Sequence, residues 1–332
     1  MIKTFLATLT PMLTLFLMIV LGFTLRRGRL LPDNAGKTMA KLENWAFLPA
    51  LSFMTQARYF RIETLSAHAT NVLLSTVMLF VAIGIAYLLA RHFAKPGTSE
   101  YGIFLYAITF ANFGYMGDPI VQALYGDVGL SYYKLFCLPL SIGVYTFGIS
   151  CMVKGKSGLR SILNPPTLAM VAGMVIGLVG AIDYFPAFVI NTLDSLQKCM
   201  APVAMLLAGF TVASYDLKEM LTDKKVYLCS ALRLTVLPAI LIAVLFGFKE
   251  LLNLIFGFSI GNMPLFLLFF AAAGPLGLNT VVFPEAYGGS PKTGAGMALI
   301  SHTLAVITIP LMLALMLLIF KENPLAALAA SV

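Results

Sequence analysis

Charged residues are scarce in this sequence. Asp, Glu, Lys and Arg together make up 11% of the 332 residues, whereas apolar residues make up 60%. A soluble domain carries about 25% charged residues, because water must wet its surface. The composition therefore excludes an ordinary soluble protein and predicts a chain whose surface faces lipid or other helices. The net charge of +8 does not indicate nucleic-acid binding, because the basic residues lie in short clusters between apolar runs.

Cysteines are few, and the common catalytic motifs are missing. The four cysteines form no CxxC pair, and each lies inside an apolar run, so we expect small core residues rather than disulfides or metal ligands. No Walker loop, HExxH, GxSxG or cluster of metal ligands is present. These absences argue against ATP-driven transport within the chain. They also predict a protein that is not an enzyme and has neither cofactor nor metal.

The apolar residues are gathered into ten runs of about the length that crosses a bilayer. About 20 apolar residues span the hydrocarbon core as a helix, and the runs are continuous rather than alternating, which favours helices over a barrel. The predicted spans are residues 5–25, 41–57, 70–90, 101–124, 131–153, 165–182, 193–213, 227–248, 262–287 and 295–320. We therefore expect an all-α polytopic membrane protein with ten transmembrane helices.

Lysine and arginine are distributed unevenly between the two sides of such a bundle. If the N-terminus is outside, fourteen of them lie in or beside the cytoplasmic loops and seven lie on the opposite side. Positive residues favour the cytoplasmic side of a membrane. The bias therefore predicts that the N-terminus and the C-terminus are both outside.

The two halves of the chain resemble each other. Pro11 and Gly22 in the first span match Pro166 and Gly177 in the sixth at one constant offset. Two units of five spans have opposite orientations, because five is odd, and this inverted-repeat architecture is typical of alternating-access transporters. We predict one five-helix repeat over residues 1–155 and a second, inverted one over residues 160–322.

Glycine and proline are concentrated at corresponding places in the fourth and ninth spans. The two stretches are Phe110-Ala111-Asn112-Phe113-Gly114-Tyr115-Met116-Gly117-Asp118-Pro119 and Ala273-Gly274-Pro275-Leu276-Gly277-Leu278-Asn279-Thr280. A broken helix is tolerated in a membrane only where protein or a water-filled cavity satisfies the freed backbone groups. A half-helix that begins in mid-membrane also offers N–H groups and a partial positive charge, which suit a carboxylate. The alternative is a pair of packing kinks.

Ionisable side chains inside the predicted spans are candidates for function. Asp118 lies six residues after Asn112 and can relay a proton or pair with a cation. Arg233 in the eighth span can neutralise it or attract an anion. We favour a structural pair between Asp118 and Arg233. His302 in the tenth span titrates in a range suited to proton coupling, although a hydrogen-bonded core histidine is the more common case. Asn279 and Thr280 either line the site opposite Asn112 or cap a half-helix.

Three segments resemble one known family. The run from Asn112 to Gly126 resembles the fourth helix of the auxin efflux carrier family, which includes the plant PIN carriers and bacterial malonate and malate permeases. The segment from Pro275 to Tyr287 resembles the second crossover of that family. Leu48-Pro49-Ala50-Leu51-Ser52-Phe53 resembles its second-helix signature. The resemblance covers essentially all ten spans.

The resemblance implies how the helices are divided. The helices within about 5–57 and 165–213 would form a scaffold. Those within about 70–153 and 227–320 would form a mobile transport domain, with the fourth and ninth spans broken and crossing. One departure from the family is Ala111, where a proline is common. Another is the short loop at residues 154–164, which favours a bacterial protein in the inner (plasma) membrane.

The resemblance also implies a substrate site. Asn112 would contact the substrate carboxylate, Pro275 would be the second crossover proline, and Leu48 and Ser52 would face the site from the scaffold. The other candidate substrate-binding residues lie in the two crossovers: Gly114, Gly277, Asn279 and Thr280.

These observations predict a secondary active or facilitative transporter that moves small organic anions, such as malonate, malate or auxin-like acids, by alternating access. The expected partners are the anion, the bilayer, protons or sodium as a coupling ion, and a second copy of the chain through the scaffold. A sodium-coupled symporter of the bile-acid-carrier type is an alternative. A membrane receptor or an intramembrane enzyme is an alternative from another class, but a protease would need paired catalytic residues that the sequence does not offer.

Overall fold

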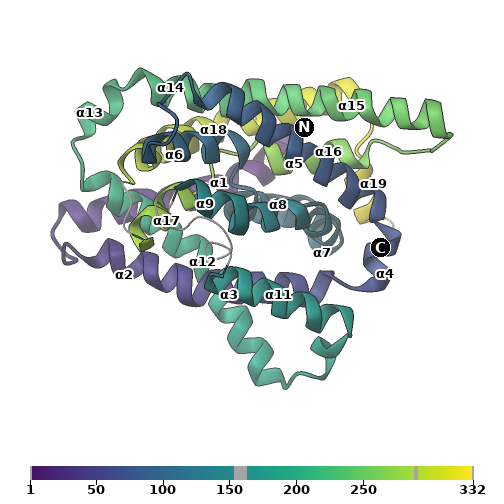
Figure 1. Cartoon of the computed structure of the whole chain (residues 1–332), viewed down its shortest axis with the longest axis horizontal. Coiled ribbons are helices and arrows are strands. Elements are labelled where there is room, and N and C mark those ends of the chain that lie inside the picture. The colour runs from purple at the N-terminus through teal and green to yellow at the C-terminus, as the bar shows by residue number, and fades with distance from the viewer. Residues whose placement is uncertain (1, 153–162, 288–290, 331–332) are drawn as a thin grey trace.

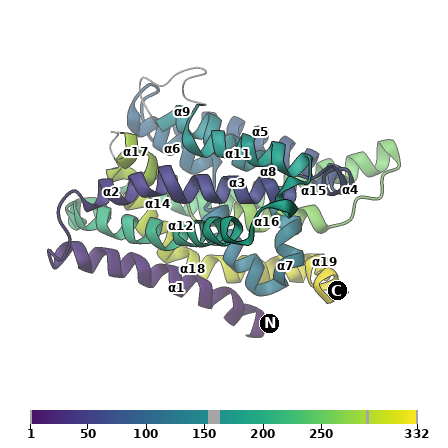
Figure 2. The same ribbon diagram turned by 90° about the horizontal axis from the view of Figure 1, so that it is seen from below.

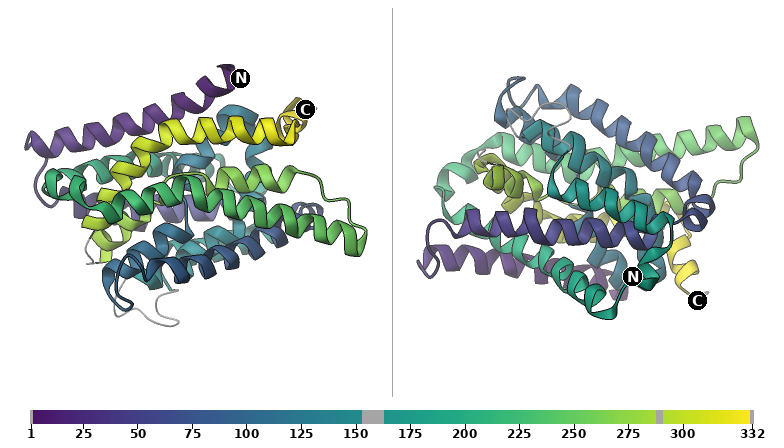
Figure 3. Two further views of the ribbon diagram at one scale, coloured as in Figure 1. Left: turned by 90° about the horizontal axis from the view of Figure 1, so that it is seen from above. Right: turned by 60° about the horizontal axis from the view of Figure 1, so that its bottom comes forward.

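The computed structural model describes residues 2–152, 163–287 and 291–330, and these residues form helices and no β-strand. The long helices run roughly side by side along one axis (Figure 1). Both termini lie toward the same end of that axis (Figure 3). The boundary predicted between the two repeats, at residues 155–160, lies outside the described residues.

The first half of the chain contains helices that match the first five predicted spans in position. Here η1, η2 and η3 are π-helical turns. The elements are α1 (Ile2–Arg27), α2 (Ala35–Leu42), η1 (Glu43–Phe47), α3 (Leu48–Tyr59), α4 (Ile62–Ala67), α5 (Ala69–Ala90), α6 (Ser99–Thr109), η2 (Phe113–Gly117), α7 (Asp118–Phe136), α8 (Leu138–Gly143), η3 (Val144–Gly148) and α9 (Ile149–Met152).

The second half follows a related order. Here η4 is a 3₁₀ turn and η5 a π-helical turn. The elements are α11 (Pro165–Leu178), η4 (Ala181–Tyr184), α12 (Ala187–Ala213), α13 (Leu217–Thr222), α14 (Lys224–Ala231), η5 (Leu232–Val236), α15 (Leu237–Phe256), α16 (Met263–Ala272), α17 (Asn279–Tyr287), α18 (Lys292–Phe320) and α19 (Pro324–Ala330).

Several helices are long and apolar enough to cross a bilayer. By length and composition these are Leu9–Arg27, Ala69–Ala90, Ala187–Ala213, Lys224–Phe256 and Lys292–Phe320. Val128–Phe136 and Leu138–Met152 are apolar enough only when taken together, with a bend of 49° between them, as a broken span or a re-entrant loop. The chain is thus a multi-pass membrane protein. The other predicted spans fall on shorter or interrupted helices, so the count of ten crossings stays a prediction.

Prolines explain three of the π turns, η1, η2 and η5, whereas the helix α9 that follows η3 contains no proline. Pro49, Pro119 and Pro238 each stand in the first turn of an α-helix directly after η1, η2 or η5. Proline has no N–H, and its ring crowds the carbonyl four residues earlier. A π turn relieves this conflict by inserting one residue into the hydrogen-bond ladder, so that the helix continues past the proline.

Two helix pairs pack very closely. α1 lies along α12, and α3 lies along α11 (Figure 2). At the first contact a Cβ on Gly209 would come within 1.9 Å of the Ile19 carbonyl oxygen, so only glycine allows this approach. At the second, a Cβ on Gly173 would come within 2.4 Å of the Phe53 carbonyl oxygen. Small residues serve this purpose between membrane helices, where dispersion contacts replace the hydrophobic effect.

Candidate functional site

The two predicted helix breaks are present, and they meet. α6 ends at Thr109 and α16 ends at Ala272, and each is followed by non-helical residues before the next helical turn begins. The Asn112 N–H donates to the Pro275 carbonyl at 2.7 Å, and the Gly277 N–H donates to the Phe110 carbonyl at 3.2 Å. The two segments therefore form a short antiparallel bridge, which satisfies backbone groups that lipid could not.

Arg233 lies where the two interrupted helices end. Its guanidinium donates to the Ile108 carbonyl at 3.2 Å and to the Ala272 carbonyl at 2.6 Å, and its side chain is fully buried. The last carbonyls of a helix lack partners inside the helix and carry its partial negative charge. Arg233 thus supplies donors and positive charge to the C-terminal ends of both α6 and α16.

The predicted pair between Asp118 and Arg233 is wrong. Asp118 instead forms an ion pair with Lys134, and the two side chains are 17% and 11% exposed. The reason is the geometry of α7, which has a non-helical break at Gly126 (φ 64°). The chain reverses there, and eight residues on each side of Gly126 bring Lys134 back beside Asp118.

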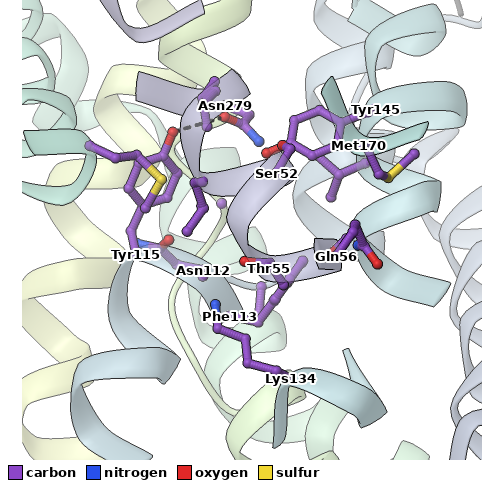
Figure 4. Close-up of a pocket in the computed structure, with 18 of the residues that line it drawn as sticks. Ser52, Thr55, Gln56, Asn112, Phe113, Tyr115, Lys134, Tyr145, Met170 and Asn279 are labelled. Carbon is purple, nitrogen blue, oxygen red and sulfur yellow. Dashed lines mark hydrogen bonds between the residues drawn. The ribbon is translucent and has the colours of Figure 1, made fainter. Parts of the chain in front are cut away.

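An inner cavity of about 50 Å³ lies beside the crossing. Six of the sequence-predicted site residues line it: Leu48, Ser52, Asn112, Gly114, Gly277 and Asn279. Figure 4 shows Ser52 and Thr55 of α3 on one side of this space and Asn112 and Tyr115 on the other, with Lys134 nearby. The cavity therefore lies between α3 and the crossing, as the resemblance implies for a site shared by scaffold and transport domain.

Other predicted site residues have different positions. The Pro275 carbonyl is used in the crossing, and the Thr280 hydroxyl donates to the Gly277 carbonyl at 3.0 Å, so neither lines the cavity. Asn279 donates to the Tyr106 hydroxyl at 2.9 Å and accepts from the Tyr115 hydroxyl at 3.3 Å. Asn279 and Thr280 are thus both engaged in hydrogen bonds within the crossing region.

His302 lies behind Asn112 rather than in the cavity. Its Nε2 is 2.9 Å from the Asn112 Nδ2, and its Nδ1 is 2.8 Å from the Ala298 carbonyl oxygen. Both side chains are buried. Among the described residues, the Oδ1 of Asn112 has no hydrogen-bond partner.

A larger outer cavity of about 360 Å³ continues from the inner one. The two share lining residues, among them Thr55, Gly114 and Lys134. Arg58, Lys198 and Asp118 line the outer cavity as well; Arg58 is paired with Asp194 at 2.8 Å, and Asp118 is paired with Lys134. Lys134 therefore stands between the outer cavity and the inner cavity.

Several lining residues are absent from the sequence prediction, among them Lys134, Thr55 and Gln56. The place of Lys134 beside Asp118 depends on the turn at Gly126, which the sequence alone does not predict. Thr55 and Gln56 follow Leu48 and Ser52 at helical spacing, so they share a face with residues that had been selected.

Comparisons with known proteins match the chain to membrane transport proteins. A family model described as "Membrane transport protein" matches residues 7–157 and 149–313. An uncharacterized transporter of Methanocaldococcus jannaschii is 23% identical over 219 residues, which cover 62% of this chain and 69% of the relative.

Proposed function

The chain belongs to the membrane transport protein family, the auxin efflux carrier family of the sequence resemblance, and we propose that it carries small organic anions by alternating access. Membership makes it a membrane transporter. The cargo class, the mechanism and the coupling ion are the subject of the proposal.

The charge of the inner cavity carries the proposal of an anionic cargo. Among the described residues that line it, Lys134 has the one charged side chain, and no carboxylate is present. The first N–H groups of the helix that begins at Phe113 have no partners within that helix, and its N-terminal end bears a partial positive charge. A carboxylate would therefore meet an ammonium group, helix N–H groups and the Asn112 amide in one place.

The packing supports a division into scaffold and transport domain. The proposed scaffold consists of α1, α2–α3, α11 and α12, which pack in the close pairs α1–α12 and α3–α11. Both crossing segments lie on the transport side, and the cavity lies between α3 and the crossing. Movement of the crossing past α3 would carry a bound anion from one side of the membrane to the other.

The proposed orientation places the open side outside. With both termini outside in a bacterial plasma membrane, the Arg58 end of α3 lies at the outer face. The outer cavity, which Arg58 lines, then leads from the exterior to the inner cavity. The structure would correspond to an outward-facing state.

The test is flux into proteoliposomes. Uptake of labelled malonate, malate and indole-3-acetate is compared with that of protein-free liposomes, with sodium present or replaced by choline. An Asn112→Ala variant is expected to lower the specificity constant for uptake by about 10- to 150-fold, because a hydrogen bond to a charged group contributes about 1.5 to 3 kcal/mol.

The matched control is Asn191→Ala, at an exposed asparagine of α12 outside both cavities. It should transport at the wild-type rate. Wild-type uptake by Asn112→Ala would refute the site, and no uptake of any acid would refute the cargo class. Uptake that stops in choline would favour the sodium symporter.

A further inference from the structure

His302 is a buried titratable group for which the transport mechanism above has no use. Its ring makes two contacts among the described residues, to the carbonyl of Ala298 and to the amide of Asn112. A carbonyl oxygen can only accept, so Nδ1 must carry a hydrogen and donate to Ala298. In the neutral ring Nε2 is then an acceptor.

This state of the ring fixes the direction of the Asn112 amide. An acceptor Nε2 needs a donor, so the NH₂ group of Asn112 faces His302, at the observed 2.9 Å. The Oδ1 of Asn112 is thereby turned away from the ring, and it is buried with no hydrogen-bond partner in the part of the chain that the structure describes. The Oδ1 of Asn112 cannot donate a hydrogen bond to a carboxylate, whose oxygens also only accept hydrogen bonds.

We propose that His302 is a positioning residue that couples one proton to the binding of one carboxylate by turning the Asn112 amide. A hydronium ion gives its proton to Nε2 and leaves as water, and no other bond changes. Both ring nitrogens then donate, so Nε2–H requires Oδ1 of Asn112 as its acceptor. The amide turns by half a rotation, Oδ1 gains a partner, and the NH₂ group is free to donate to the cargo.

Among the groups around the His302 ring, the Asn112 amide is the one whose contact changes when the ring takes up a proton. The buried titratable side chains on elements packed against α18 are Arg233 on η5, Cys229 on α14 and Tyr106 on α6. Arg233 donates to the carbonyls at the ends of α6 and α16, and Tyr106 is hydrogen-bonded to Asn279.

Carboxylates on the same set of elements do not reach the ring. Those with described side chains are Glu100 on α6, Asp194 on α12 and Glu285 on α17. None of them is within hydrogen-bond distance of His302, so none holds the proton in place of the Asn112 contact.

The inference rests on the proposed function and adds to it the proton as the coupling ion. Binding of the proton and of the carboxylate favour each other by the same factor, because linkage is reciprocal. If both ligands change sides together, the positive charge of the ring offsets one negative charge of the cargo. A monocarboxylate would then cross without net charge.

The experiment counts protons in purified protein. Wild-type protein in nanodiscs, in weak buffer at pH 7.5 with an indicator dye, is mixed with indole-3-acetate, which is fully ionised there. Protons should be taken up as the acid binds, and the dissociation constant should fall on acidification from pH 8 to pH 7. His302→Gln should take up about none and bind with little pH dependence.

The control is His92→Gln, at an exposed histidine outside both cavities, which should behave as wild type. Binding without proton uptake by wild-type protein overturns the coupling, whether or not His302→Gln folds. Flux of acids with no proton uptake would overturn this inference alone, whereas absence of both binding and flux for malonate, malate and indole-3-acetate would overturn the proposed function with it.

Discussion

Substitution of Lys134 separates a role in binding from a role in structure. Three variants form the set: Lys134→Met, Asp118→Asn and the double variant. Lys134→Met removes the charge at the inner cavity and leaves Asp118 covered and unpaired. The double variant removes the charges of both Lys134 and Asp118, so no isolated carboxylate is left buried in the fold.

The magnitudes follow from the burial of the pair. With side chains only 11% and 17% exposed, truncation of Lys134 alone should cost about 2 to 5 kcal/mol of stability, most of it from the unpaired Asp118. Two opposite charges 4 Å apart at an effective dielectric of about 20 attract by about 4 kcal/mol. At an effective dielectric of about 40, between this value and that of bulk water, the attraction is about 2 kcal/mol, which corresponds to about 30-fold in affinity.

The assay combines thermal unfolding in detergent with binding of malonate by the same samples. We expect the double variant to unfold near the wild-type temperature but to bind about 30-fold more weakly. The Asp118→Asn variant should bind malonate at least as tightly as wild type, because the charge of Lys134 is then no longer neutralised by Asp118. Wild-type affinity in the double variant would refute the reasoning and leave Lys134 a structural residue.

Three further predictions test the fold around the site. Ala111→Pro should fold and transport normally, whereas Gly277→Pro should abolish transport because the Gly277 N–H donates across the bridge; flux assays compare the two. Arg233→Met should destabilise the protein by about 3 kcal/mol or more, from two charge-assisted hydrogen bonds at about 1.5 kcal/mol each, as a lowered unfolding temperature. The hydrogen bond from Arg61 lowers the pKa of Asp183 in the folded protein. The pair therefore stabilises the fold at pH values above the ordinary aspartate pKa of about 3.9. This stabilisation is lost as the pH falls through the lowered pKa of Asp183. Asp183→Asn should therefore unfold at a slightly lower temperature than wild type at pH 6 and at the same temperature at pH 2.

The helix breaks were predictable from the sequence because glycine and proline act locally. The density of these residues around Asn112 and Pro275 is enough to interrupt a helix, whatever lies beside it. The family resemblance then placed Leu48 and Ser52 beside the break, and the structure brings both to the cavity.

The partners of the ionisable groups were not predictable in the same way. Asp118 could pair with any cation at its depth in the bundle, and the choice between Lys134 and Arg233 depends on how the chain turns at Gly126. Arg233 donates to two main-chain carbonyls, and these partners are overlooked when only oppositely charged side chains are considered. The contact between His302 and Asn112 joins residues 190 positions apart, and no local pattern reports it.

The bridge at the crossing gives a reason why Ala111 can stand where relatives commonly have proline. The two hydrogen bonds of the bridge flank Ala111 and do not use its own N–H, and Phe110 before it is extended, as a residue before proline must be. The crossing is made of main-chain atoms, while the cavity wall is made of side chains. A carrier built in this way can change the side chains that select its cargo and still keep the main-chain crossing on which the proposed movement depends.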